Sequence, residues 1–238
     1  TTDGTLQLNC SQNSHGIKLA SPAHSAGQSY TLKFPTNNVT AGSALVVDSI
    51  SGSGTTATGQ LTFGSAGGLN LISTTTISNA ASSTLDVFTS TYRNYRIIGS
   101  GFTPATDGAN LDVELFQADD TEASNYYWAG LILDDDGSDG GTRTQSGGTA
   151  DNVFRIFQGA DSGGDQSQVN FDMMVFTPQL AADTTISVQS AGRRNPTRAS
   201  IQNFGGFGGS TSVMTKIKFS FSSGNIANGV ISVYGLSA

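Results

Sequence analysis

Short runs in which apolar and polar residues alternate, separated by turn-forming clusters, recur along the whole chain. The clearest run spans Met214 to Ser222, where Ile217, Phe219 and Phe221 alternate with polar side chains. A period of two places successive side chains on opposite faces of a strand, so this strand has one buried and one solvated face. The pattern predicts an all-β protein built from antiparallel sheets.

Composition agrees with strands and leaves little material for helices. The 238 residues include 30 Gly but only four Lys and two Glu, which are residues that usually cover helix surfaces. Eighteen acidic against eleven basic residues give a net charge of −7. This balance excludes a nucleic-acid-binding protein, because phosphate contacts need clustered Lys and Arg.

Membrane insertion is not expected either. No apolar run approaches the roughly 18 residues of a membrane-spanning helix. The first residues, Thr1 to Gly4, lack the basic and apolar regions of a signal peptide. The sequence therefore predicts a soluble protein.

The chain changes character near Ala80, where we expect a domain boundary. Residues 1–80 contain short runs with few apolar side chains, which predicts an extended β stem or attachment region. From about Leu85 the runs lengthen and aromatic residues concentrate, which predicts an antiparallel, jelly-roll-like β-sandwich head over residues 81–238. Long polar connections, notably Asp134 to Ala150, are expected at the ends of this sandwich.

The short strands of the N-terminal region predict self-association. Each offers about two inward apolar side chains, which is too few for an independent core. Identical strands from neighbouring copies can pair with the open edges and bury the apolar faces around a threefold axis. We therefore expect a homotrimer held by this region.

Two groups of motifs resemble proteins of tailed bacteriophages. The segments His15 to Pro22 (with K-L-x-x-P), Ser29 to Pro35 (with Y-T-L-x-F-P) and Ala41 to Asp48 resemble a pattern of tail-fibre and other virion proteins. The segments Tyr92 to Leu111 and Gly224 to Leu236 resemble the opening and the end of a β-sandwich domain of marine phage structural proteins.

This resemblance implies a non-enzymatic structural protein of the virion, namely a trimeric tail fibre or spike that is assembled in the host cytoplasm and exposed on the particle. Its partners are then other tail or capsid proteins, and its head binds the host surface, including cell-surface glycans. The alternative is a capsid-mounted fibre, knob or decoration protein, because the segment before His15 is too short for a tail-attachment module. A polysaccharide-depolymerase tailspike is the less favoured alternative.

One aromatic side chain is a candidate for receptor contact. Tyr126, Tyr127 and Trp128 are consecutive, and alternation places Tyr127 on the opposite face from the other two. We expect Trp128 in the core, since large aromatics dominate sandwich interiors. Tyr127 is then the residue that can stack on a sugar ring.

Two charged clusters complete the candidate receptor loops, Asp134, Asp136 and Asp139 in one and Arg193, Arg194 and Arg198 in the other. The acidic cluster lacks the Gly and Glu spacing of an EF-hand, so a solvated turn is favoured over a looser calcium site. The basic cluster is expected to be solvated or paired with an acidic loop of a neighbouring subunit. An anionic glycan is the alternative partner.

Metal, cofactor and catalytic sites are not predicted. His15 and His24 lie near Cys10, but zinc needs about four ligands at tight spacings. No nucleophile elbow, zinc-protease motif or phosphate loop is present, and Glu114 is expected on the solvated face of a strand. The Gly-rich segment Phe204 to Gly209 is predicted as a mobile loop tip or a subunit contact.

Overall fold

The computed structural model describes residues 5–9, 16–39, 41, 43–64, 68–135, 141–163, 167–195, 198–208 and 211–236. The chain divides into two compact units, Thr1–Ala66 and Gly67–Ala238. The boundary predicted near Ala80 therefore moves toward the N-terminus. The reason is β6 (Leu69–Ala80), which pairs along its length with the C-terminal strand β17 (Ile226–Leu236) and so belongs to the larger unit.

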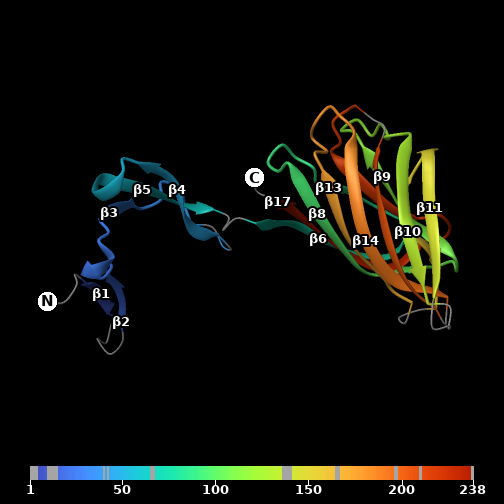
Figure 1. Ribbon diagram of the computed structural model, residues 1–238, viewed down its shortest axis with the longest axis horizontal. Helices are drawn as coiled ribbons and strands as arrows, with labels where there is room; N and C mark the ends of the chain where they lie inside the picture. Colours follow the sequence, from blue (N-terminus) through green and yellow to red (C-terminus); the bar gives the residue numbers. More distant parts are fainter. Residues whose placement is uncertain are drawn as a thin grey trace. The chain divides into compact units, whose positions relative to one another are not determined.

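The N-terminal unit contains two small sheets (Figure 1). In the first, β1 (Thr5–Asn9) pairs antiparallel with β2 (Gly16–Ala20). In the second, β5 (Ala57–Gly64) lies between β3 (Tyr30–Lys33), to which it is parallel, and β4 (Ala44–Ser51), to which it is antiparallel. Two single turns of 3₁₀ helix, η1 (His24–Ala26) and η2 (Gly54–Thr56), precede β3 and β5.

The C-terminal unit is a β-sandwich of an eight-stranded and a four-stranded antiparallel sheet (Figure 1). The larger sheet has the strand order β11-β10-β15-β14-β13-β8-β17-β6. Its remaining strands are β8 (Asn94–Pro104), β10 (Tyr126–Asp134), β11 (Thr142–Asp151), β13 (Val169–Phe176), β14 (Thr184–Asn195) and β15 (Arg198–Gly208). The smaller sheet has the order β12-β9-β16-β7, with β7 (Ser82–Asp86), β9 (Ala109–Phe116), β12 (Phe154–Ala160) and β16 (Lys216–Phe221).

Alternation in the sequence produces the core between these sheets. In β16 the side chains of Ile217, Phe219 and Phe221 are buried, as predicted, while Lys218 and Ser220 are partly exposed. The Phe219 ring stacks on Phe171 of β13, with ring centroids 5.7 Å apart, which joins the smaller sheet to the larger one. The prediction of an all-β protein with an antiparallel sandwich is therefore confirmed.

One strand was not predicted. The connection expected between Asp134 and Ala150 contains β11, which pairs with β10 at the edge of the larger sheet. The described side chains of β11 are exposed or partly exposed, so the strand shows no apolar alternation in the sequence. Backbone pairing with β10 is what defines it.

No helix in the described part of the chain is both long and apolar enough to cross a lipid bilayer.

Candidate functional site

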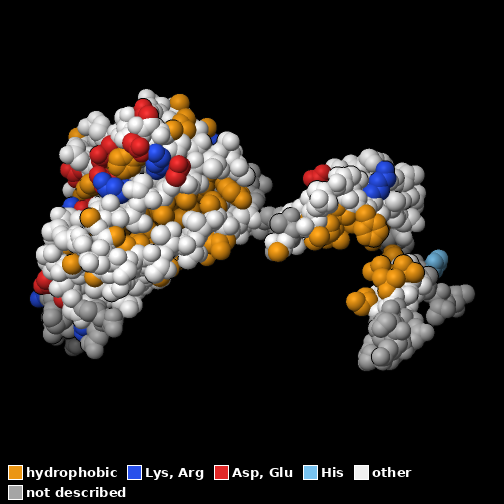
Figure 2. Space-filling view, turned by 180° about the vertical axis from the view of Figure 1, so that it is seen from behind, with side chains coloured by type: hydrophobic (Ala, Val, Ile, Leu, Met, Phe, Trp, Pro, Cys, Tyr) orange, Lys and Arg blue, Asp and Glu red, His pale blue; other side chains and the backbone are white. Residues whose placement is uncertain are grey.

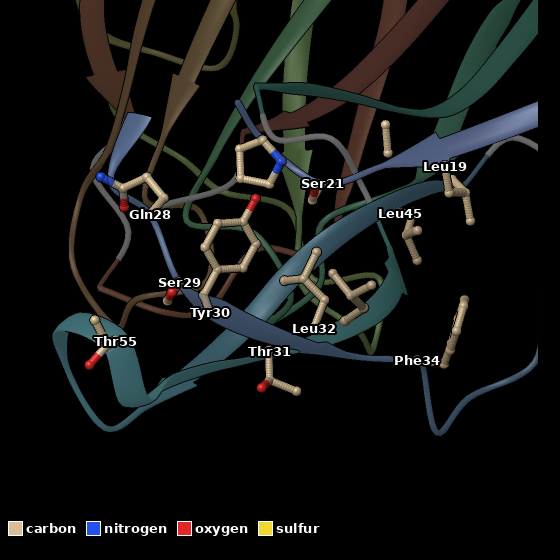
Figure 3. Close-up of a pocket in the computed structure, with 13 residues that line it drawn as sticks. Leu19, Ser21, Gln28, Ser29, Tyr30, Thr31, Leu32, Phe34, Leu45 and Thr55 are labelled. Carbon is tan, nitrogen blue, oxygen red and sulfur yellow. The ribbon is translucent and has the colours of Figure 1, made fainter. Parts of the chain in front are cut away.

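One face of the three-stranded N-terminal sheet is apolar. On adjacent strands Leu45 is opposite Phe63 and Val47 is opposite Leu61, and side chains opposite each other lie on the same face. On the third strand Tyr30 and Leu32 point to one side of β3, and Thr31 points to the other (Figure 3). We call Tyr30, Leu32, Leu45, Val47, Leu61 and Phe63 the apolar N-terminal face.

The apolar N-terminal face is continuous because of a glycine at its centre. Gly59 is paired with Leu32 across the parallel strands. A Cβ at Gly59 would lie 3.1 Å from Leu32 Cδ2 and 3.4 Å from Val47 Cγ1. These two side chains therefore pack over the glycine, in the space that a larger side chain would occupy. Leu32 of β3 and Val47 of β4 thereby meet across the middle strand.

The described residues of the N-terminal unit leave this face largely uncovered. Tyr30, Leu32, Leu45 and Val47 keep between 49% and 55% of their surface exposed. Among the described residues of the N-terminal unit, Gly59 is the only one that is buried. A unit of this size needs a buried apolar core to be stable, and the side chains described for it do not form one.

A hollow of about 800 Å³ opens beside the apolar N-terminal face (Figure 3). It is lined by Tyr30, Leu32 and Leu45 of the face, by Leu19 of β2, and by Phe34, which follows β3 and is 79% exposed. An apolar hollow of this volume can receive several large side chains of a partner.

The β1–β2 hairpin repeats the same division into two faces. Leu6 is opposite Leu19 and Leu8 is opposite Ile17 on one face, and Gln7 is opposite Lys18 on the other. The four apolar side chains are between 57% and 74% exposed. Figure 2 shows the apolar side chains of the N-terminal unit gathered in patches on its surface.

The opposite face of the three-stranded sheet carries polar side chains beside Val46, and several of them form hydrogen bonds within the chain. Asn37 Nδ2 donates to the Phe63 carbonyl at 2.8 Å, and Asn37 Oδ1 accepts from the Phe63 amide and from Thr62 Oγ1 at 3.1 Å. Gln60 Nε2 donates to the Phe34 carbonyl at 2.8 Å. These bonds hold the segment after β3 against β5, whereas the apolar face has no comparable contacts among the described residues.

Tyr127 lies where the sequence predicts it. Tyr126 and Trp128 are buried, whereas Tyr127 is 39% exposed on the outer face of the larger sheet. Its ring stacks on Phe207 of β15, with centroids 5.2 Å apart and an angle of 22° between the rings. Phe207 was missed as a partner because the pairing depends on the register of β10 and β15, for which the sequence carries no signal.

The segment Phe204 to Gly208 is part of β15, so the expectation of a mobile loop tip is wrong for these residues. Phe204 points inward, is 3% exposed and packs edge-on against Trp128. Gly206 is required because the neighbouring backbone is close: a Cβ at Gly206 would lie 2.0 Å from the Tyr127 carbonyl oxygen.

Asp134 is not part of a surface loop. It is the last residue of β10, is 5% exposed and forms an ion pair with Arg194 of β14 in the same chain. The alternation of β10 turns this position inward, and Arg194 compensates the buried charge. The predicted contact between acidic and basic clusters therefore occurs within one chain, and Asp136 and Asp139 lie outside the described residues.

The other two arginines of the basic cluster remain at the surface. Arg193 is partly exposed on β14 and its carbonyl accepts a bond from the Asp161 amide at 3.0 Å. Arg198 is exposed at the start of β15. Because β14 and β15 continue to these residues, the cluster belongs to strand ends rather than to a separate loop.

Two acidic side chains of β9 are buried, against the expectation of a solvated strand face. Asp112 is 3% exposed and its Oδ1 accepts from Arg155 Nε at 2.9 Å; Glu114 is 8% exposed and its Oε2 lies 2.6 Å from Lys218 Nζ. Both lie on the outer face of the smaller sheet, where cations on the neighbouring strands cover them. Figure 2 shows acidic and basic side chains gathered together on the sandwich.

This charged cluster shifts several ionisation equilibria. Burial raises the pKa of Asp112, and this effect exceeds the opposing effect of Arg155. Burial, followed by the neighbouring Glu114 carboxylate, raises the pKa of Glu122. Burial also raises the pKa of Tyr126, whose hydroxyl oxygen accepts from the Leu115 amide at 2.7 Å.

Within the described residues, no group of three or more His, Cys, Asp and Glu side chains is placed to hold a metal ion. His24 is exposed in η1, and Cys10 and His15 lie outside the described residues.

No family model, curated protein or solved structure matches this chain.

Proposed function

We propose that the protein is a non-enzymatic structural component of a virion, in which the N-terminal unit associates with the same unit of two further copies. The single observation that carries this proposal is the apolar N-terminal face, which is exposed although polar side chains on the opposite side of the same sheet form hydrogen bonds within the chain. Burying such a face is the dominant source of stability available to the unit.

A second copy is the simplest partner for this face. The six residues of the apolar N-terminal face include no charge, so the face offers nothing that would select a partner by opposite charge. Closed symmetric assemblies of identical chains are the commonest oligomers, and they repeat the same apolar patch around an axis. Three copies are proposed because the motif resemblance to phage fibres implies interlaced trimers.

The sandwich is proposed as the head of this fibre or spike, with a jelly-roll-like topology. Three strand pairs support that topology, because they are nested in the chain: β8 with β17, β9 with β16, and β10 with β15. Nested antiparallel pairs distributed over two facing sheets are what a jelly roll requires. The head is the part proposed to contact the host surface.

Sedimentation equilibrium of the full chain tests the self-association. We expect a mass three times that of the 24.5 kDa chain at micromolar concentration. A monomer whose N-terminal residues are verified as intact by mass spectrometry would refute the proposal.

Image reconstruction of the particle tests the placement. Density on the tail supports the proposed fibre or spike, and density on the capsid faces or vertices would replace it with the capsid-mounted alternative. Incubation with host capsule or lipopolysaccharide tests the non-enzymatic role, since a depolymerase releases oligosaccharides and we expect no release.

A further inference from the structure

We infer that the outer face of the larger sheet, over β10, β15 and β14, is a binding site for a neutral polysaccharide chain. This inference deepens the proposed role of the sandwich as the binding part of the protein and rests on it. It places the ligand on a sheet face rather than on the loops.

The first element of this site is an aromatic platform. Tyr127 and Phe207 are directly opposite each other on β10 and β15, are stacked with an angle of 22° between their rings, and are 39% and 38% exposed. Each ring has an electron-rich face that attracts the partly positive C–H groups of a sugar ring. Because the two rings stack on each other, each covers one face of its partner and keeps its other face and its edge available to a sugar ring.

The second element is a floor of small residues beside this platform. Gly205 is opposite Ala129 on one side and opposite Ser187 on the other, so three small residues cross the three strands in one row. A Cβ placed on Gly205 would have only the Ile186 carbonyl oxygen within 4 Å, at 3.8 Å. The space above the floor is therefore open, and a ligand can approach the backbone there.

The third element is a row of neutral amides on the other side of the floor. Asn203 is opposite Gln189 of β14 and opposite Leu131 of β10, which in turn is opposite Gln145 of β11. All three amide side chains are exposed. Each amide provides donors and an acceptor, which is the combination that sugar hydroxyls require.

The order of these elements favours a sugar over a protein partner. Successive rows on one face of a strand are about 7 Å apart, so the platform and the amides are separated by the floor. The core of a protein interface is enriched in large apolar side chains and depleted in Ser and Ala, whereas the centre of this face consists of Ala129, Gly205 and Ser187.

The three rows on β10, β15 and β14 contain no charged side chain, which favours a neutral ligand. On the next strand, β13, Asp172 lies opposite Gln189 and is paired with Arg96. Arg143 and Arg198, which are exposed, and Arg193, which is partly exposed, lie beyond the amide row, and the buried Asp134 is paired with Arg194. A hollow of about 370 Å³ at that end is lined by Leu133, Asp134, Asp135, Arg143 and Ile201 among others, so it contains charged groups and is not part of the proposed site.

Affinity electrophoresis of the full chain in gels containing mannan, barley β-glucan, galactomannan or alginate tests this inference. We expect at least one of the three neutral polymers to retard the protein, with retardation that is unchanged by added salt. The variant Tyr127→Ala/Phe207→Ala is expected to weaken this binding about tenfold or more. Gly205→Leu fills the open floor without a positive φ and is expected to abolish retardation.

Two matched controls separate binding from folding. Thr84→Leu places the same leucine side chain on the exposed outer face of the smaller sheet, and Arg93→Gln removes an exposed arginine away from the site; both are expected to bind as the wild type does. Binding that persists in Gly205→Leu, retardation by alginate alone that salt removes, or no retardation by any neutral polymer would each overturn the inference.

The mass of the same samples distinguishes the remaining outcomes. An unretarded protein of three-chain mass refutes the sugar site and leaves the proposed self-association standing. A retarded monomer supports the site and refutes the self-association. If Tyr127→Ala/Phe207→Ala reduces the mass, the face is a contact between copies and the inference fails.

Discussion

The two units of this chain differ in how the apolar faces of their strands are covered. The sandwich buries complete apolar side chains such as Phe219, Ile97 and Val113 between its own sheets. The N-terminal unit has strands with equally clear two-faced patterns, yet Leu32, Leu45 and Val47 remain about half exposed. The comparison shows that alternation of apolar and polar residues determines which face of a sheet is apolar. Whether that sheet is stable in a single chain depends on a second sheet that packs against the apolar face.

The largest expected effect tests the self-sufficiency of the sandwich. Phe219→Ala removes a ring that stacks on Phe171 and is expected to cost about 3–5 kcal/mol of unfolding free energy. Denaturant unfolding followed by the fluorescence of the single Trp128, which is buried in the same core, measures this loss. Ser220→Ala, its neighbour on the outer face, should change the midpoint little; equal effects of the two substitutions would contradict a core between the sheets.

The second prediction concerns the N-terminal unit. Leu32→Asp places a charge on the apolar N-terminal face. We expect the free energy of association to become less favourable by about 2–3 kcal/mol for each chain in the assembly. Sedimentation should show a lower mass at the same concentration, while the unfolding midpoint of the sandwich stays unchanged. Thr31→Asp, on the opposite side of β3, is the matched control and should leave the mass unaltered.

A smaller effect is expected at the buried ion pair of the sandwich. Arg194→Met leaves the Asp134 carboxylate buried without its cation, and we expect a loss of about 1–3 kcal/mol. Arg194→Met/Asp134→Leu removes both charges and should recover most of that stability. Denaturant midpoints of the three chains check the prediction, and no recovery in the double variant would contradict it.

The smallest effect is a pH dependence of the sandwich. Burial raises the folded-state pKa of Asp112 above its unfolded value of about 3.9, so the folded state binds the proton more tightly. This contribution to stability is complete below the unfolded pKa and is lost as the pH rises through the raised pKa. Relative to Asp112→Asn, wild-type stability should therefore fall with rising pH in that window, and a rise would contradict the shift.

Much of the architecture follows from the sequence, because a strand with one buried and one exposed face has alternating apolar and polar residues. The strand with Ile217 and Phe219, and the division of Tyr126 and Trp128 from Tyr127, are readable in this way. The strand β11 leaves no such pattern, because its described side chains are not buried and pairing alone defines it.

The contacts between distant strands could not be predicted in the same way. The pairing of Tyr127 with Phe207 depends on the register of β10 and β15, and that of Asp134 with Arg194 joins the ends of two strands that are not neighbours in sequence. The burial of Asp112 likewise follows from Arg155, which a different strand supplies. Alternation in a sequence indicates which side chains share a face of a strand, but it does not indicate the register in which two strands pair.

The most direct test of the account is the sedimentation equilibrium mass of the intact full chain at micromolar concentration. If the apolar N-terminal face is buried against the same unit of neighbouring copies, we expect a single species of three chains. This species should dissociate on dilution without unfolding of the sandwich. A stable monomer in which hydrogen exchange shows the amides of β3, β4 and β5 to be as protected as those of β16 would contradict it.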